Sequence, residues 1–306
     1  MHDRRYRKWQ QLFEKTAEHD VEPTPSTHAR RALKILFLGT AAAEGIPSPF
    51  CECPTCTHAR EAGGRNVRMR TATLVNDDLL FDCGPDLIAA TQRFGVRLSR
   101  LETLLVTHAH DDHLLPSNLA WRGPGFCPTP ITPLYIFGPG PVTRTFRRDR
   151  HWPTLAEKGA VSLETVRAGQ RWQSGQYQIT ALPATHDSNR TSLLYIVNDG
   201  VHKLFYATDS GPLSERAWRI VAREAPFDAV LMEETMGRTP RCEEHHNTQS
   251  FLEAHGRFVR EEWLTGDARF VAFHFSHQSN PPHDELVRYF APHGVLVAYD
   301  GMGLIL

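Results

Sequence analysis

The sequence contains no apolar run of about eighteen residues, so it offers no candidate for a membrane-spanning helix. The first twenty residues are strongly charged and lack the apolar core of a secretion signal, which leads us to expect a cytoplasmic protein. The formal net charge is only −1, so no overall basic field is present to attract a nucleic-acid backbone. Cysteine is scarce too, with six in 306 residues, yet three of them fall within six consecutive positions.

This cysteine cluster, "CECPTC", places Cys51, Cys53 and Cys56 in a C-x-C-x-x-C arrangement. Thiols stay reduced in the cytoplasm, so clustered cysteines are better interpreted as metal ligands than as disulfides. A tetrahedral zinc site needs one further donor. The other cysteines are isolated in the sequence and fit that position poorly; they are Cys83, Cys127 and Cys242.

The apolar content of 41% over 306 residues is enough for one large domain or two small ones. Residues 1–33 show a weak helical period followed by a stretch with two prolines, which predicts a surface-packed helix and a linker. From residue 34 to residue 306, short apolar strands are interspersed with helical segments predicted at 87–94, 213–223, 248–261 and 284–290. This order predicts a layered α/β domain with two sheets at its centre.

Several predicted strands run directly into a residue type that can bind a metal ion. They are "LLVT" before His108, "ITALPAT" before His186, "KLFYAT" before Asp209 and "RFVAF" before His274. Ligands at strand ends can converge on one edge of the sheets, where a rigid scaffold holds them at fixed distances. We therefore expect these four side chains to lie close together.

The first of these strands opens onto "THAHDDH", which contains an H-x-H-x-D-H arrangement made by His108, His110, Asp112 and His113. The alternating His108 and His110 leave the strand end on the same side, whereas Asp112 and His113 turn toward a second point. Imidazole and carboxylate ligands together suit zinc, manganese or iron(II). Three histidines and an aspartate within six residues favour a metal site over a polar loop with chance histidines.

This spacing resembles the metallo-β-lactamase superfamily, and the resemblance covers nearly all of residues 34–306. It implies a four-layer αββα sandwich with a dinuclear metal site at one sheet edge. The implied ligands of one ion are His108, His110 and His186, those of the other are Asp112, His113 and His274, and Asp209 would bridge the two ions. Asp112 would in addition belong to the catalytic residues. The strand end "LLFDCG" also matches, so Asp82 would either orient a ligand histidine or serve as a simple turn residue.

The charges of such a site suit an anionic substrate. Two divalent ions carry four positive charges, and two aspartates cancel half of them. Two neighbouring ions can lower the pKa of a bridging water to give hydroxide, and they can clamp the attacking and leaving oxygens, which favours phosphodiester hydrolysis. Zinc and manganese both suit these ligands, and the fold alone would also allow lactam or thioester hydrolysis.

Within the superfamily, the sequence resembles the PhnP-type phosphoribosyl 1,2-cyclic phosphate phosphodiesterases of phosphonate breakdown. The segments that match are "LGTAAAEGIPSPFCECPTC", "DCGPDL", the H-x-H-x-D-H loop and "HFSH". The resemblance implies one structural zinc ion held by Cys51, Cys53, Cys56 and His277. Such a closed site would fix the loop after the first strand onto the rim of the catalytic centre.

A general acid is expected in "EEHHNTQSF", because a histidine precedes Ser/Asn–Thr at a helix start in the phosphodiesterase branches. The pattern selects His246, which could protonate the leaving alkoxide, and Glu233 in "LMEETM" matches an acidic residue that orients such a histidine. The alternative is that Asn247 or Thr248 simply caps the helix and His246 is exposed.

The favoured hypothesis is a metal-dependent phosphodiesterase that hydrolyses a small cyclic phosphate or nucleotide-like ester. The sequence leaves the oligomeric state open, with a homodimer as one candidate assembly. A tRNA 3′-processing endonuclease shares the ligand set, but the chain is not basic and the cysteine cluster is foreign to that branch. A protein of pyrroloquinoline-quinone biosynthesis shares the fold and the C-x-C-x-x-C loop. The fourth hypothesis is a non-enzymatic, metal-stabilised binding module in which residues 1–33 recruit a partner.

Overall fold

The computed structural model of the protein describes residues 32–306, except 124, 128–131, 188–190 and 241. The extension predicted over residues 1–33 therefore lies outside the described residues, apart from its last two positions. Leu33 is buried and pairs with Leu306 through backbone hydrogen bonds of 3.3 and 3.0 Å, so the compact unit begins just before residue 34. No helix in the described part of the chain is long and apolar enough to cross a membrane.

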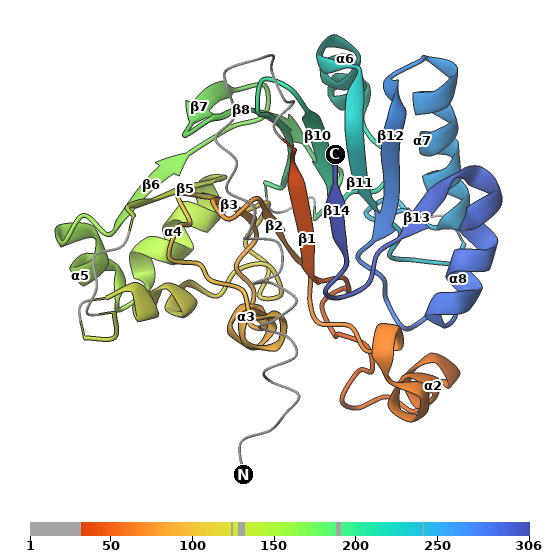
Figure 1. Ribbon diagram of the computed structural model, residues 1–306, viewed down its shortest axis with the longest axis horizontal. Coiled ribbons are helices and arrows are strands. Elements are labelled where there is room, and N and C mark those ends of the chain that lie inside the picture. The colour runs from red at the N-terminus through yellow and green to blue at the C-terminus, as the bar shows by residue number, and fades with distance from the viewer. Residues whose placement is uncertain (1–31, 124, 128–131, 188–190, 241) are drawn as a thin grey trace, which may run out of the picture. The chain divides into compact units, whose positions relative to one another are not determined.

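Two seven-stranded sheets form the centre of this unit (Figure 1). The first sheet has the order β14 (Gly303–Ile305), β1 (Lys34–Gly39), β2 (Ala72–Val75), β3 (Leu79–Phe81), β4 (Thr103–Leu105), β5 (Leu134–Gly138) and β6 (Val161–Thr165). The second has the order β13 (Val295–Val297), β12 (Leu264–Phe273), β11 (Phe227–Glu233), β10 (Lys203–Ala207), β9 (Leu193–Asn198), β8 (Tyr177–Pro183) and β7 (Arg171–Ser174). Each sheet is mixed, with antiparallel pairs on one side and parallel pairs on the other.

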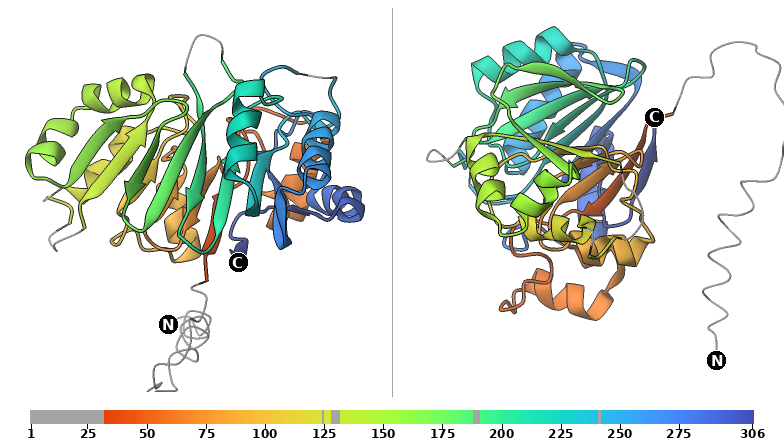
Figure 2. Two further views of the ribbon diagram at one scale, coloured as in Figure 1. Left: turned by 90° about the horizontal axis from the view of Figure 1, so that it is seen from above. Right: turned by 90° about the vertical axis from the view of Figure 1, so that its left-hand side faces the viewer.

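Helices cover the outer face of each sheet (Figure 2). The first sheet carries α3 (Leu87–Phe94), α4 (Gly140–Arg148) and α5 (Trp152–Glu157), and the second carries α6 (Glu215–Glu224), α7 (Thr248–Arg260) and α8 (His283–Phe290). A further helix, α2 (Pro54–Ala62), follows β1, and short 3₁₀ turns occur at η1 (Gly64–Asn66), η2 (Pro116–Arg122) and η3 (Ala291–His293).

The core follows from the two-residue period of the strands. In β11, Val230 and Met232 pack under the helices, whereas Ala229 and Leu231 pack against the other sheet. Apolar side chains, most of them from strands, fill the layer between the two sheets. A separate apolar cluster lies beneath the helices on each outer side. The predicted four-layer αββα sandwich is thus confirmed.

The four predicted helices are present, with ends shifted by two residues or fewer. The helix expected from residue 213 begins at Glu215, because the Ser214 hydroxyl accepts a hydrogen bond from the Ala217 amide at 3.3 Å and caps the helix. The patterns did not predict α2, α4, α5, β6, β7 or β14. The helix α4 begins in a Pro-Gly-Pro segment, which is more typical of a turn, although proline is compatible with the first helical turn.

Candidate metal centres

The predicted ligands gather in two adjoining groups, and the donor atoms within each group lie within 4.8 Å of one another. The first group is His108, His110 and His186, and the second is Asp112, His113, Asp209 and His274. In the first group, His110 Nδ1 lies 2.8 Å from His108 Nε2 and 3.1 Å from His186 Nε2. Three ring nitrogens that face a common point are a donor set suited to zinc.

Asp209 lies between the two groups. Its Oδ2 atom is 3.3 Å from His108 Nε2 and 2.6 Å from His113 Nε2, and its Oδ1 atom is 3.2 Å from His274 Nε2. Asp112 Oδ2 completes the second group at 3.0 Å from His113 Nε2. One carboxylate can therefore reach an ion in either group, which is the geometry that the predicted bridging role requires.

The outward-facing ring nitrogen of each of these histidines has its own partner. The Nδ1 pairs are His108 with Thr107 Oγ1 at 3.0 Å, His113 with Asp82 Oδ2 at 2.8 Å, His274 with Thr235 Oγ1 at 2.9 Å and His186 with the Glu244 carbonyl at 3.3 Å. In His110 the roles are exchanged, because Nε2 lies 3.1 Å from Asp187 Oδ2. Partners of this kind fix the tautomer and leave the inward nitrogen free to coordinate, so the donor set fits two divalent ions.

Asp82 organises this outer layer and is completely buried. Its Oδ2 pairs with His113, while its Oδ1 accepts hydrogen bonds from the Thr107 amide at 2.8 Å and the Thr107 hydroxyl at 3.0 Å. The geometry therefore favours the orienting role over that of a simple turn residue. Positive φ angles, which residues other than glycine rarely adopt, occur at Asp82 (64°), Asp209 (47°) and His274 (60°). Such backbone strain is typical of functional sites, where it re-aims a side chain at a strand end.

Gly84 lies where the loop after β3 touches the H-x-H-x-D-H loop, and a Cβ atom there would lie 1.8 Å from the Asp112 carbonyl oxygen. We expect Gly84→Ala to push this loop away, to weaken ion binding by Asp112 and His113, and to lower the free energy of unfolding by about 1–3 kcal/mol. Thermal unfolding and metal content per chain measure the two effects. Gly266→Ala is the matched control because its Cβ meets no atom within 4 Å; equal behaviour of the two variants would contradict the prediction.

Asp112, His113 and Asp209 of the second group favour the charged forms of one another. Burial lowers the pKa of His113, but the carboxylates of Asp112, Asp209 and Asp82 outweigh burial and raise this pKa well above its usual value. Burial raises the pKa of Asp209, but His274 and His113 outweigh it and hold this pKa well below its usual value. A divalent ion would replace the proton on His113, so metal affinity should rise with pH.

His245, which the sequence patterns did not select, lies beside this centre. Its Nδ1 is 3.0 and 3.3 Å from the two carboxylate oxygens of Glu233 and 3.6 Å from Asp209 Oδ1. Its ring lies 4.7 Å from that of His186, centroid to centroid. Burial lowers the pKa of His245, but the carboxylates of Glu233 and Asp209 outweigh it and raise the pKa to about 10.

Glu233 contacts His245 in this geometry, and the general-acid role expected of His246 stays a prediction. His246 is 1% exposed, and its Nδ1 lies 3.0 Å from Ser250 Oγ in the first turn of α7. Asn247 caps this helix, since its Oδ1 accepts from the Ser250 amide at 2.9 Å while Ser250 Oγ accepts from the Asn247 amide at 3.1 Å. The cap thus fixes residue 246 against the helix, whereas His245 belongs to the bend before it and faces Glu233.

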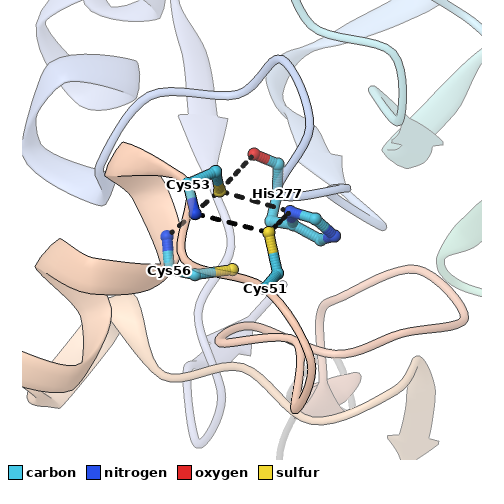
Figure 3. Close-up of side chains that lie close together, drawn as sticks. All are labelled: Cys51, Cys53, Cys56 and His277. Carbon is cyan, nitrogen blue, oxygen red and sulfur yellow. Dashed lines mark hydrogen bonds between the residues drawn. The ribbon is translucent and has the colours of Figure 1, made fainter.

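The clustered cysteines meet His277 at a separate place, where the segment leading into α2 approaches the loop after β12 (Figure 3). His277 Nδ1 is 3.5 Å from Cys51 Sγ and 3.4 Å from Cys53 Sγ, and Cys56 Sγ completes a group of donors within 4.8 Å. A tetrahedral zinc ion with Zn–N and Zn–S distances of about 2.0–2.3 Å needs donors about 3.4–3.8 Å apart. The separations measured from His277 Nδ1 meet this requirement.

Backbone amides contact each of the three sulfur atoms of this cluster. The Cys56 amide lies 3.5 Å from Cys53 Sγ, the Cys53 amide 3.4 Å from Cys51 Sγ and the Ser48 amide 3.3 Å from Cys56 Sγ. Burial raises the pKa of Cys53, but the hydrogen bonds from Cys56 and His277 outweigh it and lower this pKa to about 7. Cys53 can therefore supply a thiolate near neutral pH.

We expect Cys53→Ser to abolish zinc binding at this site. The thermal midpoint should fall by at least about 4 °C, because each kcal/mol lost shifts it by about 2–4 °C in a domain of this size. Elemental analysis should find one ion fewer per chain, whereas Cys127→Ser, which changes a cysteine outside the cluster, should keep all ions. Unchanged zinc content in the Cys53 variant would contradict the assignment.

Comparison with known proteins agrees with this architecture. The chain matches the family model described as "Beta-lactamase superfamily domain" over residues 78–275. Ribonuclease BN of Erwinia tasmaniensis is 29% identical over 161 residues, which covers 50% of this chain and 46% of that protein. The chain thus spans about half the length of the curated relatives that it matches.

Two solved structures share the fold over almost the whole chain. A diphosphatase from the PhnP family has a TM-score of 0.70 and 18% identity, covering 90% of this chain and 98% of its own. Zinc-bound PqqB from Methylobacterium extorquens has a TM-score of 0.68 and 18% identity, covering 89% and 100%. Since the family model alone extends over well more than half of the sequence, this protein belongs to the metallo-β-lactamase superfamily.

Proposed function

We propose that this protein is a metal-dependent phosphodiesterase that hydrolyses a small cyclic phosphate or a nucleotide-like phosphodiester. The observation that carries the proposal is the position of Asp209, whose carboxylate lies between two groups of metal donors and 3.6 Å from His245. Hydrolysis of a phosphodiester needs positive charge for the phosphoryl oxygens and an acid for the leaving oxygen. With ions bound, this arrangement would supply both at one edge of the sheets.

The two groups of donors would each hold one ion. One ion would bind His108, His110 and His186, the other would bind Asp112, His113 and His274, and Asp209 would contact both. When bound, two divalent ions lower the pKa of water and neutralise charge on phosphoryl oxygens. Zinc and manganese are the ions that these nitrogen and oxygen donors suit best.

His245 takes the place of His246 as the proposed general acid. Glu233 is buried and holds the His245 ring through Nδ1, which leaves Nε2 to deliver a proton to the leaving oxygen. The Ser210 amide donates to the same Glu233 oxygen at 2.6 Å and keeps the carboxylate in place. The pKa of His245 is raised to about 10 by Glu233 and Asp209 against the effect of burial, and nearby divalent ions would lower it toward neutrality.

The direct test is hydrolysis of bis(p-nitrophenyl) phosphate and of a panel of cyclic phosphates by protein loaded with zinc or manganese. We expect release of p-nitrophenol to stop in a chelator and to return when the ion is added back. Absence of metal-dependent turnover with every ester, in protein shown to hold its ions, would contradict the proposal.

A ribonuclease is the second candidate, because Ribonuclease BN of Erwinia tasmaniensis matches half of the chain at 29% identity. The net charge of −1 argues against tight binding of a long polyanion such as RNA, since such binding needs clustered lysine and arginine. Incubation with a precursor tRNA separates the two candidates. Specific cleavage at the 3′ end, faster than hydrolysis of any small diester, would favour the ribonuclease.

A further inference from the structure

One short segment after β12 belongs to both candidate metal centres. His274 is in the dinuclear group, and His277, three residues later, is in the cysteine site. Ser276 lies between them, and its hydroxyl donates a hydrogen bond to Glu44 Oε1 at 2.6 Å. The same carboxylate oxygen lies 3.4 Å from His277 Nε2. Glu44 therefore contacts the segment midway between the two centres and also at one ligand.

Glu44 reaches this position from a loop that is firmly attached to the segment. Thr40, at the start of the loop, accepts a hydrogen bond from the Phe275 amide at 2.9 Å, and the Ala42 amide donates to the Phe275 carbonyl at 2.9 Å. The Glu44 side chain is 26% exposed and lies against this segment. The backbone next to His274 and the Glu44 side chain are thus parts of one hydrogen-bonded unit.

The chemistry of this contact is that of an outer partner of a metal ligand. A carboxylate on the Nε2 side of His277 favours a proton there and leaves Nδ1, which faces Cys51 and Cys53, free to coordinate zinc. The bond to Ser276 restrains the backbone that also carries His274. These two contacts join Glu44 to Ser276 and His277 and not to a donor of the dinuclear group. Its effect on the dinuclear group would therefore pass through Ser276.

We propose that Glu44 is a positioning residue that couples the two metal centres, so that zinc at the cysteine site strengthens binding of the divalent ion that His274 would hold. Coupling free energies are reciprocal, so loading the dinuclear centre also strengthens retention of the zinc ion. The inference rests on the metal-binding part of the proposed function and is independent of which ester, if any, the protein hydrolyses.

The first experiment measures the affinity of each site for cobalt(II) and zinc(II) by competition with a chelator, using full-length Glu44→Ala protein. Thiolate-to-cobalt absorption reports the cysteine site separately from the dinuclear centre. We expect both affinities to fall by about 10- to 100-fold, as is usual when an outer partner of a ligand is removed. Glu44→Gln should recover part of the loss, because its amide oxygen can still accept from Ser276. The matched control is Glu52→Ala, which removes an 85% exposed carboxylate of the same loop and should leave both affinities unchanged.

The second experiment tests the coupling itself. Cys51→Ser, which empties the cysteine site, should weaken ion binding at the dinuclear centre, and adding Glu44→Ala should weaken it little further. Ser276→Ala removes only the hydroxyl that joins Glu44 to the segment, and it gives the same comparison should Glu44→Ala fail to fold.

Loss of zinc with unchanged affinity at the dinuclear centre would overturn the coupling, and unchanged affinity at both sites would overturn the positioning role. Intact coupling in a protein that hydrolyses no phosphodiester would overturn the proposed function alone.

Discussion

Asp209→Ala is expected to reduce the proposed phosphodiesterase activity by on the order of 10³-fold or more, because metal ions contribute several kcal/mol and each 1.4 kcal/mol is about tenfold in rate. The reason is its position: Oδ2 is 2.6 Å from His113 Nε2 and Oδ1 is 3.2 Å from His274 Nε2, so one side chain would serve both ions. Initial rates with bis(p-nitrophenyl) phosphate and ions per chain measure the effect. Zinc at the cysteine site should remain.

The control for this variant is Asp111→Ala. Asp111 belongs to the same H-x-H-x-D-H run, but it is exposed and lies outside both groups of donors. Its removal should leave rate and ion content close to those of the parent protein. An Asp209 variant that keeps two ions at the dinuclear centre and full activity would contradict the bridging role.

His245→Ala is expected to reduce hydrolysis of a diester with a poor alkyl leaving group by about 10²–10⁴-fold, the usual contribution of a general acid. The loss should be much smaller with p-nitrophenolate, which leaves without a proton. Burial lowers the pKa of His245, but Glu233 and Asp209 outweigh burial and raise this pKa to about 10 in the ion-free protein; divalent ions at the neighbouring centre would lower it. The rate with the alkyl ester should therefore fall as pH rises through the pKa that His245 has when the ions are bound.

His246→Ala is the comparison that decides between the two neighbouring histidines. His246 is buried against Ser250, so its removal should lower stability and slow both esters by the same factor. A loss that is selective for the alkyl ester in the His246 variant, and absent in the His245 variant, would favour His246, the general acid that the sequence predicts.

The sequence could bring the expected donors together because their signal is local. Four of them follow apolar strands, and strands of a layered fold end at a shared edge, so His108, His186, Asp209 and His274 could be grouped without coordinates. The motif spacing then supplied the rest. The structure places all seven predicted donors in two adjoining groups and the four predicted zinc ligands in a third.

The choice between His245 and His246 could not be made in the same way. Both precede the cap of α7, and the motif alone favours the histidine next to Asn247. Which ring faces Glu233 depends on the bend that ends at the cap and on a strand end that is distant in sequence. The outer partners Thr107, Thr235 and Asp187 were missed for a related reason, since threonine and aspartate in loops carry no pattern that distinguishes them.

The sequence patterns also failed to predict two strands at the edges of the sheets. In β7 ("RWQS") most residues are polar, so no apolar period marks the strand. β14 has only three residues. Such short strands gain their stability from a neighbour, here β8 and β1, and hence from long-range pairing that a local period does not report.

Anomalous X-ray scattering from crystals of the metal-loaded protein tests the central claim most directly. The account predicts three peaks per chain: two about 3.5–4 Å apart on either side of Asp209, and one among Cys51, Cys53, Cys56 and His277. Data collected at the zinc and manganese edges would also identify the ions. A single peak at the cysteines, with none beside Asp209 after loading with excess zinc or manganese, would contradict it.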